Sequence, residues 1–463
     1  MGMAVGLSLL MAGMQAQISL PSVFADHMVL QQKSEVPVWG WGDASATVKV
    51  VGSWAPKDTA TATVRSDGSW DTTLKTAAAG GPYTLSVLGN GSCELKDVML
   101  GEVWLCSGQS NMEWTPMANI DNRDEEIAAA DYPNIRFFHI PKRGAATPQN
   151  NCEASWATCT PDVMKNTSAV AYFFGRDLQK DLNVPIGLIV SAWGGTPAEV
   201  WTPEELVMDN PRLRDAMPDK TYPWWPVEPG VLYNQMINPV TPYALAGAIW
   251  YQGESNRDHP DSYGILMKTM IESWRKSFKK DFPFYLVQIA PFTYNAGDNG
   301  AALVREHQEW VARTVPGCGM VAISDCVADL KNIHPTDKQS VGLRLANLVL
   351  GKTYGRLESG FESPVFEGMT VNKNKAVISF LHADNGLMCK EKQIVGFRIA
   401  GEDGVFEPAK AQIKESTVVV SSPKVKNPVM VQYCFDDATV GNLFNKEGLP
   451  VAPFRTDRNW DNE

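Results

Sequence analysis

The segment LCSGQSNMEW contains a serine whose surroundings are those of a candidate nucleophile. Ser110 follows an apolar run of strand character and is flanked by Gly108-Gln109 and Asn111-Met112. The nucleophile elbow of many hydrolases, G-x-S-x-G, needs a glycine where this chain has Met112. Serines in glycine-containing turns also commonly cap helices or close turns. The segment therefore indicates either a nucleophile of another hydrolase type or a structural serine.

Three further polar segments supply the other groups that acyl transfer requires. Gly194 and Gly195 follow the apolar run PIGLIVSAW, and His334 lies in the segment NIHP. The segment after LAGAIWY holds Gln252, Gly253, Glu254, Ser255 and Asn256. Together with Ser110 these offer a nucleophile, a general base and donors for a developing oxyanion. The combination favours a catalytic serine.

The elements around these segments predict a fold that brings them together. Across residues 98–358, short apolar runs alternate with stretches of helical spacing, which is typical of a parallel sheet with helices on both faces. In such folds ligands bind at the carboxyl ends of the strands, where all four polar segments fall. Residues 18–97 consist of short alternating strands and predict a small β-sandwich. Residues 359–463 return to β character and predict a second β-rich region.

Composition and charge exclude several classes of function. The net charge of −11 and the pI near 5.2 argue against nucleic acid or an anionic membrane surface as the partner. After the first residues no run approaches the ~18 apolar residues of a membrane span. Residues 1–17 are apolar and small, and predict a signal peptide and export to the periplasm or the cell exterior. The chain has no C-x-x-C or H-E-x-x-H motif, so neither a metal nor another cofactor is expected.

The eight cysteines permit disulfides in an exported protein without requiring any. Three pairs are considered: Cys152 with Cys159 and Cys318 with Cys326 are close enough to pair locally, and Cys389 and Cys434 share the C-terminal region. Cys106 lies in an apolar strand and is expected to be a buried free thiol.

Six segments in order make the chain resemble the sialate O-acetylesterase family of the SGNH-hydrolase superfamily. They are LPSVFADHMVLQQ, GEVWLCSGQSNMEW, SAWGGTPAEVW, IWYQGESN, NIHPTDK and GLPVAPFRTD. The resemblance implies an α/β fold, with an SGNH-type, flavodoxin-like parallel-sheet hydrolase domain and flanking β-sandwich modules. It also implies that Ser110 is the nucleophile and His334 its base. The oxyanion would be bound by the amides of Ser110 and of Gly194 or Gly195, and by the side chain of Gln252 or Asn256.

Two departures from the pattern of the superfamily leave roles open. The third segment usually ends G-x-N-D, whereas here Ser255 stands at the asparagine position; we favour Gln252 as the amide donor. The last segment often reads D-x-x-H, but Lys331 occupies the acidic position. Glu254, Asp329 and Asp325 are candidates for the acid that orients His334, with Glu254 favoured. The alternative is a Ser–His dyad assisted by a backbone carbonyl.

Candidate substrate-binding residues lie outside the six segments. Trp224 and Trp225, in the segment YPWWP, are interpreted either as an aromatic wall for a sugar ring or as loop packing. Arg305, on an expected helix, is interpreted either as a ligand for a sialic acid carboxylate or as part of a solvated helix face. Because a histidine base must be neutral, activity is expected to rise with pH through about 6 to 7.

The expected function is that of an exported serine esterase acting on O-acetylated sugars through an acetyl-serine intermediate. O-acetylated sialic acids are the favoured substrates, and acetylxylan or another polysaccharide is the alternative. A protein that binds carbohydrate without catalysis is the alternative from another class. Turnover of a simple acetyl ester separates enzyme from binding protein.

Overall fold

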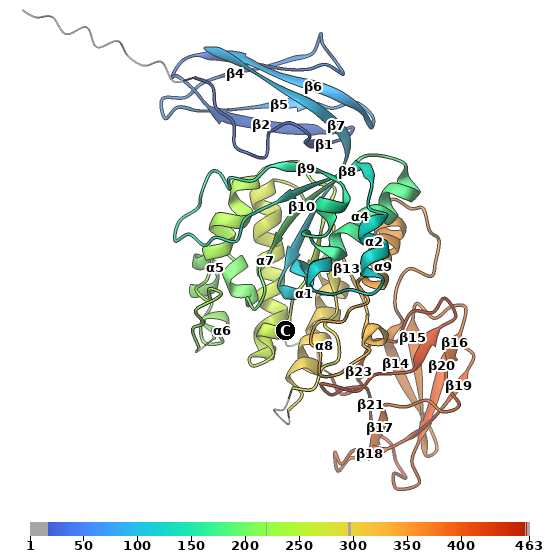
Figure 1. Ribbon diagram of the computed structural model, residues 1–463. Helices are drawn as coiled ribbons and strands as arrows, with labels where there is room; N and C mark the ends of the chain where they lie inside the picture. Colours follow the sequence, from blue (N-terminus) through green and yellow to red (C-terminus); the bar gives the residue numbers. More distant parts are fainter. Residues whose placement is uncertain (1–16, 219, 295–297, 459, 461–463) are drawn as a thin grey trace, which may run out of the picture.

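The computed structural model describes residues 17–218, 220–294, 298–458 and 460. The expected signal peptide lies outside the described residues, apart from Gln17. The chain forms three parts, with the N-terminal module at one end of a central α/β domain and the C-terminal module beside the other end (Figure 1).

The N-terminal module consists of two facing sheets. A two-stranded sheet pairs β2 (Glu35–Trp41) with β5 (Ser69–Lys75). The second contains β1 (Val29–Gln31), β3 (Thr47–Gly52), β4 (Thr59–Thr63), β6 (Gly80–Gly89) and the first half of β7 (Gly91–Gly108). Alternate residues of β2, among them Val36 and Val38, are buried between the sheets, as the period of two in a half-buried strand requires.

Strand β7 belongs to two parts of the molecule at once. Its first residues pair with β6 and β1, and its last residues pair with the strands of the central sheet. The boundary expected between residues 97 and 98 therefore lies within a single continuous strand. The N-terminal module is joined to the α/β domain through strand hydrogen bonding as well as through the chain.

The central sheet has the order β13-β12-β11-β7-β10-β8-β9. Its members are β8 (Tyr132–His139), β9 (Trp156–Cys159), β10 (Ile186–Ala192), β11 (Gly247–Tyr251), β12 (Phe284–Val287) and β13 (Cys318–Val321), with β7 at the centre. All pairs are parallel except β8 with β9, so the sheet is mixed. Strands β10, β7, β11, β12 and β13 follow the chain order 2-1-3-4-5, the order of flavodoxin-like sheets. The carboxyl ends of β7 and β11 are adjacent in this order.

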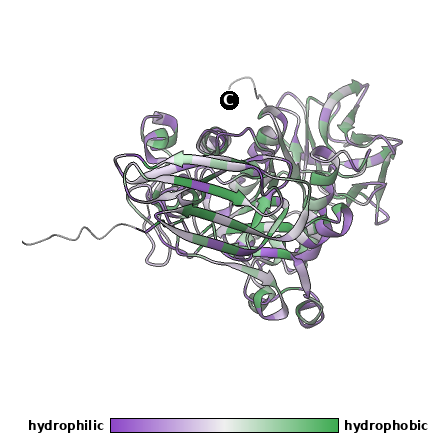
Figure 2. Ribbon diagram, turned by 90° about the horizontal axis from the view of Figure 1, so that it is seen from above, coloured by the Kyte–Doolittle hydropathy of each residue, from purple (hydrophilic) through white to green (hydrophobic). Residues whose placement is uncertain are grey.

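Helices cover both faces of the central sheet. One face packs against α4 (Ala169–Leu182) and α9 (Lys338–Lys352), and the other against α7 (Tyr263–Phe278) and α8 (Gly300–Thr314). Each residue of β10 is buried, as expected for a strand covered on both sides. Figure 2 shows hydrophobic segments concentrated along the interior strands. Short helices occupy the loops: α1 (Ser110–Glu113), α2 (Arg123–Ala128), α3 (Pro161–Met164), α5 (Glu204–Met208) and α6 (Pro211–Arg214).

The C-terminal module is built from antiparallel strands around its own core. One sheet has the order β14 (Val365–Asn372), β15 (Lys375–Leu381), β20 (Thr417–Ser421) and β19 (Lys410–Lys414). A second has the order β18 (Glu407–Pro408), β17 (Phe397–Ala400), β21 (Met430–Tyr433) and β23 (Phe454–Arg455), and β16 (Leu387–Cys389) pairs with β22 (Leu443–Asn445). The aromatic rings of Phe366, Phe380, Phe397, Tyr433 and Phe454 meet in the core between them.

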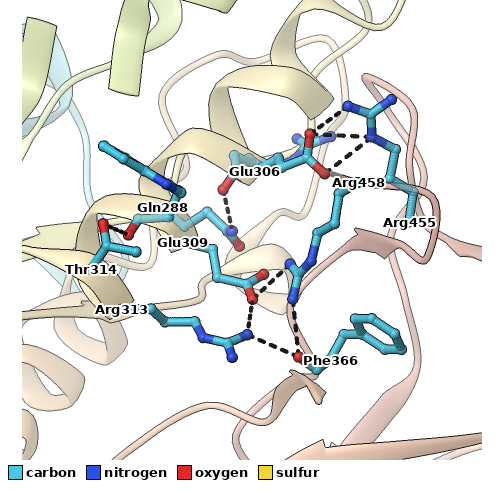
Figure 3. A network of polar contacts seen from close by, with 10 residues as sticks. Gln288, Glu306, Glu309, Arg313, Thr314, Phe366, Arg455 and Arg458 are labelled. Carbon is cyan, nitrogen blue, oxygen red and sulfur yellow. Dashed lines mark hydrogen bonds and ion pairs between the residues drawn. The ribbon is translucent and has the colours of Figure 1, made fainter. Parts of the chain in front are cut away.

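Ion pairs with buried carboxylates attach the end of the chain to α8 of the central domain (Figure 3). Arg458 donates to Oε1 of Glu309 at 2.9 Å and to the backbone oxygen of Phe366 at 3.1 Å. Arg455 donates to both carboxylate oxygens of Glu306. Arg313, also on α8, bonds to the same two acceptors as Arg458. The C-terminal module and the α/β domain therefore share one polar network.

All eight cysteines are free thiols, so none of the three pairs considered from the sequence is formed. Cys106 is buried in β7, as expected, and burial raises the pKa of its thiol well above the usual range. Among the described residues no helix is both long and apolar enough to span a bilayer.

Candidate active site

Ser110 begins helix α1 at the carboxyl end of β7. The loop before it is held on both sides, because the N–H of Gln109 donates to the oxygen of Tyr251 at 3.0 Å and the N–H of Trp193 to the oxygen of Gly108 at 3.1 Å. A Cβ at Gly108 would lie 2.2 Å from the Tyr251 oxygen, and its φ of 141° also favours glycine. Gly108 thus lets β7 end tightly against β11, which fixes the position of Ser110.

A backbone donor lies directly beside Ser110. A Cβ built on Gly194 would be 3.1 Å from the Cβ of Ser110. The N–H of Gly194 donates to Oε2 of Glu113 at 2.5 Å, and Oε1 of Glu113 accepts from Lys142 at 2.6 Å. In this structure the Gly194 amide therefore binds a negatively charged oxygen next to the candidate nucleophile.

Gly195 continues the same loop and is fixed by its neighbours. Its φ is +80°, and a Cβ there would lie 2.4 Å from the ring of Trp225. Its backbone oxygen accepts from the hydroxyl of Ser255 at 3.0 Å. No acceptor among the described residues takes up the N–H of Gly195 or of Ser110. Both N–H groups are therefore available to a ligand.

Two contacts hold His334 beside the nucleophile segment: its imidazole stacks on a tryptophan, and the backbone of the preceding residue accepts a hydrogen bond. Its imidazole stacks on Trp114, with the ring centroids 4.0 Å apart and the planes at 18°. The backbone oxygen of the preceding residue, Ile333, accepts from Nδ2 of Asn111 at 3.1 Å, and Asn111 directly follows Ser110. Burial, and secondly the charge of Lys338, lower the pKa of His334 to about 4. This value lies below the range of 6 to 7 expected from the sequence.

These groups line one cavity of about 630 Å³. Its polar lining includes Ser110, Gly194, Gly195, Glu254, Ser255 and His334, and its tryptophans are Trp114, Trp193, Trp224 and Trp225. Trp224 is 67% exposed, and its backbone oxygen accepts from Nε1 of Trp193 at 3.2 Å. Trp224 and Trp225 thus lie on the cavity wall, as their interpretation as an aromatic wall requires. Apolar ring faces beside a few convergent polar groups are typical of a small-molecule site.

Comparison with known proteins identifies the family. The family model for carbohydrate esterases described as sialic acid-specific acetylesterases matches residues 100–351, more than half of the chain. The chain is 31% identical over 398 residues to the sialate O-acetylesterase of Homo sapiens, covering 78% of this chain and 76% of the relative. It is 32% identical over 407 residues to that of Mus musculus, covering 74% and 75%.

The chain belongs to the family of sialic acid-specific acetylesterases. A solved carbohydrate acetylesterase of Xanthomonas citri, 36% identical, superimposes with a TM-score of 0.87 over 96% of this chain and 100% of that one. The resemblance recognised from the six segments is thereby confirmed.

Gln252 and Asn256, the side chains predicted to bind the oxyanion in this acetylesterase-family chain, lie behind the cavity wall. Nε2 of Gln252 donates to Oδ1 of Asn256 at 2.7 Å and to the oxygen of Thr196 at 3.3 Å. Nδ2 of Asn256 donates to Oε2 of Glu199 at 2.9 Å. Both side chains are buried and neither lines the cavity. The prediction that Gln252 or Asn256 reaches the oxyanion is not supported, because buried amides must be paired and these two are paired with protein groups.

Arg305 also lies away from the cavity. It is 1% exposed on the side of α8 that faces the C-terminal module, and its Nη2 donates to the backbone oxygen of Asp436. Neither interpretation made from the sequence was right, because the guanidinium is part of an interface between two modules.

The expected hydrogen bond between Glu254 and His334 is not formed. Glu254 lines the cavity, but its Oε1 accepts from Nδ2 of Asn111 at 2.7 Å, and its Oε2 is buried without a partner. Asp329 accepts from the backbone of Lys331, and Asp325 pairs with Arg344 at 2.7 Å. Among the described residues no carboxylate is hydrogen-bonded to the imidazole of His334.

Several residues of the site were given no role from the sequence although they stand inside the six segments. Glu113 and Trp114 follow Ser110 by three and four positions, the spacing that brings side chains to one face of a helical turn. Asn111, an amide residue, lies in the serine segment, and Lys338, a charged residue, lies in the histidine segment. Their types were visible, but their burial was not. No group of side chains suited to a metal ion occurs in the described part of the chain.

Proposed function

We propose that the protein is a serine esterase that removes O-acetyl groups from sugars through an acetyl-serine intermediate. The observation that carries the proposal is the meeting of Ser110, Gly194 and His334 in one cavity with tryptophan walls. Membership of the acetylesterase family supports the reaction class. Tryptophan faces suit the apolar C–H faces of a sugar ring, while the polar end of the cavity meets the ester.

In the first step Ser110 Oγ attacks the acetyl carbonyl carbon and His334 accepts the hydroxyl proton. The carbonyl oxygen becomes negative, and the N–H groups of Ser110 and Gly195, which no protein acceptor among the described residues takes up, donate to it in this proposal. When the tetrahedral intermediate collapses, the bond to the sugar oxygen breaks. His334 returns the proton to that oxygen, the sugar leaves, and Ser110 carries the acetyl group.

In this proposal the N–H of Gly194 has one acceptor without substrate, Glu113, and another with substrate, the oxyanion. The Glu113 carboxylate holds that N–H in the absence of substrate and must move if Gly194 is to bind the oxyanion. After leaving Gly194, the Glu113 carboxylate can stay paired with Lys142. The N–H of Gly194 thereby becomes a third donor to the oxyanion, beside those of Ser110 and Gly195, only when the ester is bound.

In the second step water enters after the sugar has left. His334 takes a proton from the water, whose oxygen attacks the acetyl carbon, and the same donors bind the second oxyanion. Acetate leaves as the proton returns to Ser110 Oγ. His334 serves as base without a hydrogen-bonded acid, so the catalytic pair is a Ser–His dyad ordered by the stacking of Trp114.

O-acetylated sialic acids are the proposed substrates, because four relatives carry the name sialate O-acetylesterase. Lys142 is one of the lining residues of the cavity, and its ammonium group is proposed to meet the sialic acid carboxylate. A neutral acetylated polysaccharide such as acetylxylan is the alternative, since Lys142 is already paired with Glu113. Export, proposed from residues 1–17, fits a glycan substrate and is tested by cell fractionation.

The decisive experiment compares the wild type with Ser110→Ala. The wild type should hydrolyse p-nitrophenyl acetate and be labelled at Ser110 by an organophosphorus probe. The variant should fold, bind no probe and lose at least about 10³-fold in kcat. Assays with O-acetylated sialic acid and acetylated xylan then separate the two substrates. An active Ser110→Ala enzyme would refute the mechanism, and an inactive wild type would leave a binding protein.

A further inference from the structure

Lys338 is a buried cation in an unfavourable place. It is the first residue of α9, where the helix dipole disfavours positive charge, and its exposed fraction is 0%. Burial of an ammonium group is costly unless it is paired. A lysine at this position therefore needs a specific reason, and helix stability does not provide one.

The contacts of Lys338 lead to the residue beside the nucleophile. Nζ donates to Oδ1 of Asn111 at 2.6 Å and lies 5.5 Å from the ring centre of Tyr251. Nδ2 of Asn111 donates to Oε1 of Glu254 and to the oxygen of Ile333. An ammonium group can only donate and a carboxylate can only accept, so these partners allow the Asn111 amide a single orientation.

This arrangement ties together three loops that the sequence places far apart. Asn111 follows Ser110, Ile333 precedes His334, and Glu254 follows β11. The side-chain amide of Asn111, whose orientation is set by Lys338, thus connects the nucleophile segment with the histidine segment. We propose that Lys338 is a positioning residue for the ester hydrolysis, and that its ammonium group acts through Asn111 on Ser110 and through its charge on His334.

The electrostatics of the site point in the same direction. In a Ser-His-Asp triad a carboxylate contacts the histidine, whereas here burial, and secondly the charge of Lys338, lower the pKa of His334. The other titratable groups in the cavity lining are Glu113, Lys142 and Glu254. Those that act on Lys338 are Glu254, Cys326 and Asp337; their attraction only partly offsets burial, which lowers the pKa of Lys338 to about 7.

The test uses two variants that separate the hydrogen bond from the charge. Lys338→Met removes both, and Lys338→Gln keeps a donor for Asn111 without the charge. For Lys338→Met we expect a loss of at least about tenfold in kcat with little change in KM. The acid limb of kcat/KM against pH should move up by about one pH unit. Lys338→Gln should recover part of kcat but keep the displaced limb.

Lys352, at the other end of α9, is the matched control. Its ammonium group pairs with Glu362 and is 34% exposed, so Lys352→Met should change neither kcat nor the pH profile. If Lys338→Met does not fold, as judged by circular dichroism, Lys338→Gln and Asn111→Ala carry the test. Asn111→Ala should lower kcat like Lys338→Met.

The inference rests on the proposed function, and the two fail in different ways. An inactive wild type overturns the esterase proposal and the role of Lys338 with it. An active wild type whose Lys338→Met or Lys338→Gln variant keeps kcat within about twofold and an unmoved acid limb overturns the inference alone.

Discussion

At the scale of single residues, the surroundings of His334 set the pH range of the reaction. Because its pKa is lowered to about 4, the neutral base is present above that value and is lost as the pH falls through it. We expect kcat/KM to fall as the pH drops through about 4, since this parameter reports the free enzyme. A pH–rate profile of the wild type measures it, and an acid limb between 6 and 7 would contradict the burial of the imidazole.

Glu254 differs from a triad acid because it contacts Asn111 rather than His334. In Glu254→Gln the side-chain oxygen can still accept from Asn111, so kcat should stay within about tenfold of the wild type. Neutralising a true triad acid costs about 10⁴-fold. Steady-state kinetics with p-nitrophenyl acetate decides between the two, with Asp329→Asn as the control. A loss beyond about 100-fold would restore Glu254 as the orienting acid.

At the scale of elements, the sequence was sufficient to place the loops but not the side chains. Alternating strands and helices predict that the segments after β7, β10 and β11 share one edge, and Ser110, Gly194 and Glu254 do line one cavity there. The direction of Gln252 could not be read from the pattern, because it depends on the acceptors that the fold places behind β11. Arg305 was misjudged for a similar reason, since helical spacing does not reveal a module packed against α8.

The loop after β10 depends on a glycine conformation that can be tested. In Gly195→Ala the positive φ costs about 1–2 kcal/mol, and the new methyl group must displace the ring of Trp225. We expect KM to rise at least about fivefold, because one wall of the cavity moves. Gly448→Ala is the control: its φ is also positive, but nothing lies within 4 Å, so only strain is added. If Gly195→Ala and Gly448→Ala had the same KM, Trp225 would have no part in substrate binding.

At the scale of the whole molecule, the C-terminal module is attached to α8 through ion pairs whose carboxylates, Glu306 and Glu309, are buried. Arg458→Ala leaves Glu309, which is 1% exposed, with Arg313 as its remaining partner. Because Glu309 keeps Arg313, losing the charge-assisted hydrogen bonds of Arg458 should cost about 1.5–3 kcal/mol. Thermal unfolding and limited proteolysis should show a loosened C-terminal module. Lys424→Ala, which breaks an exposed pair with Glu407, should change stability by at most about 0.5 kcal/mol.

Strand β7 bears on the order in which this protein can assemble during translation. The partners of its first half, β6 and β1, precede it in the chain, whereas β10 and β11, the partners of its second half, are synthesised after it. Domains fold as units from the N-terminus while the ribosome adds about 5–20 residues per second. The sandwich can therefore be complete before residues 186–251 exist, and its last strand extends beyond it as a template. The catalytic sheet then grows to either side of the strand that delivers Ser110.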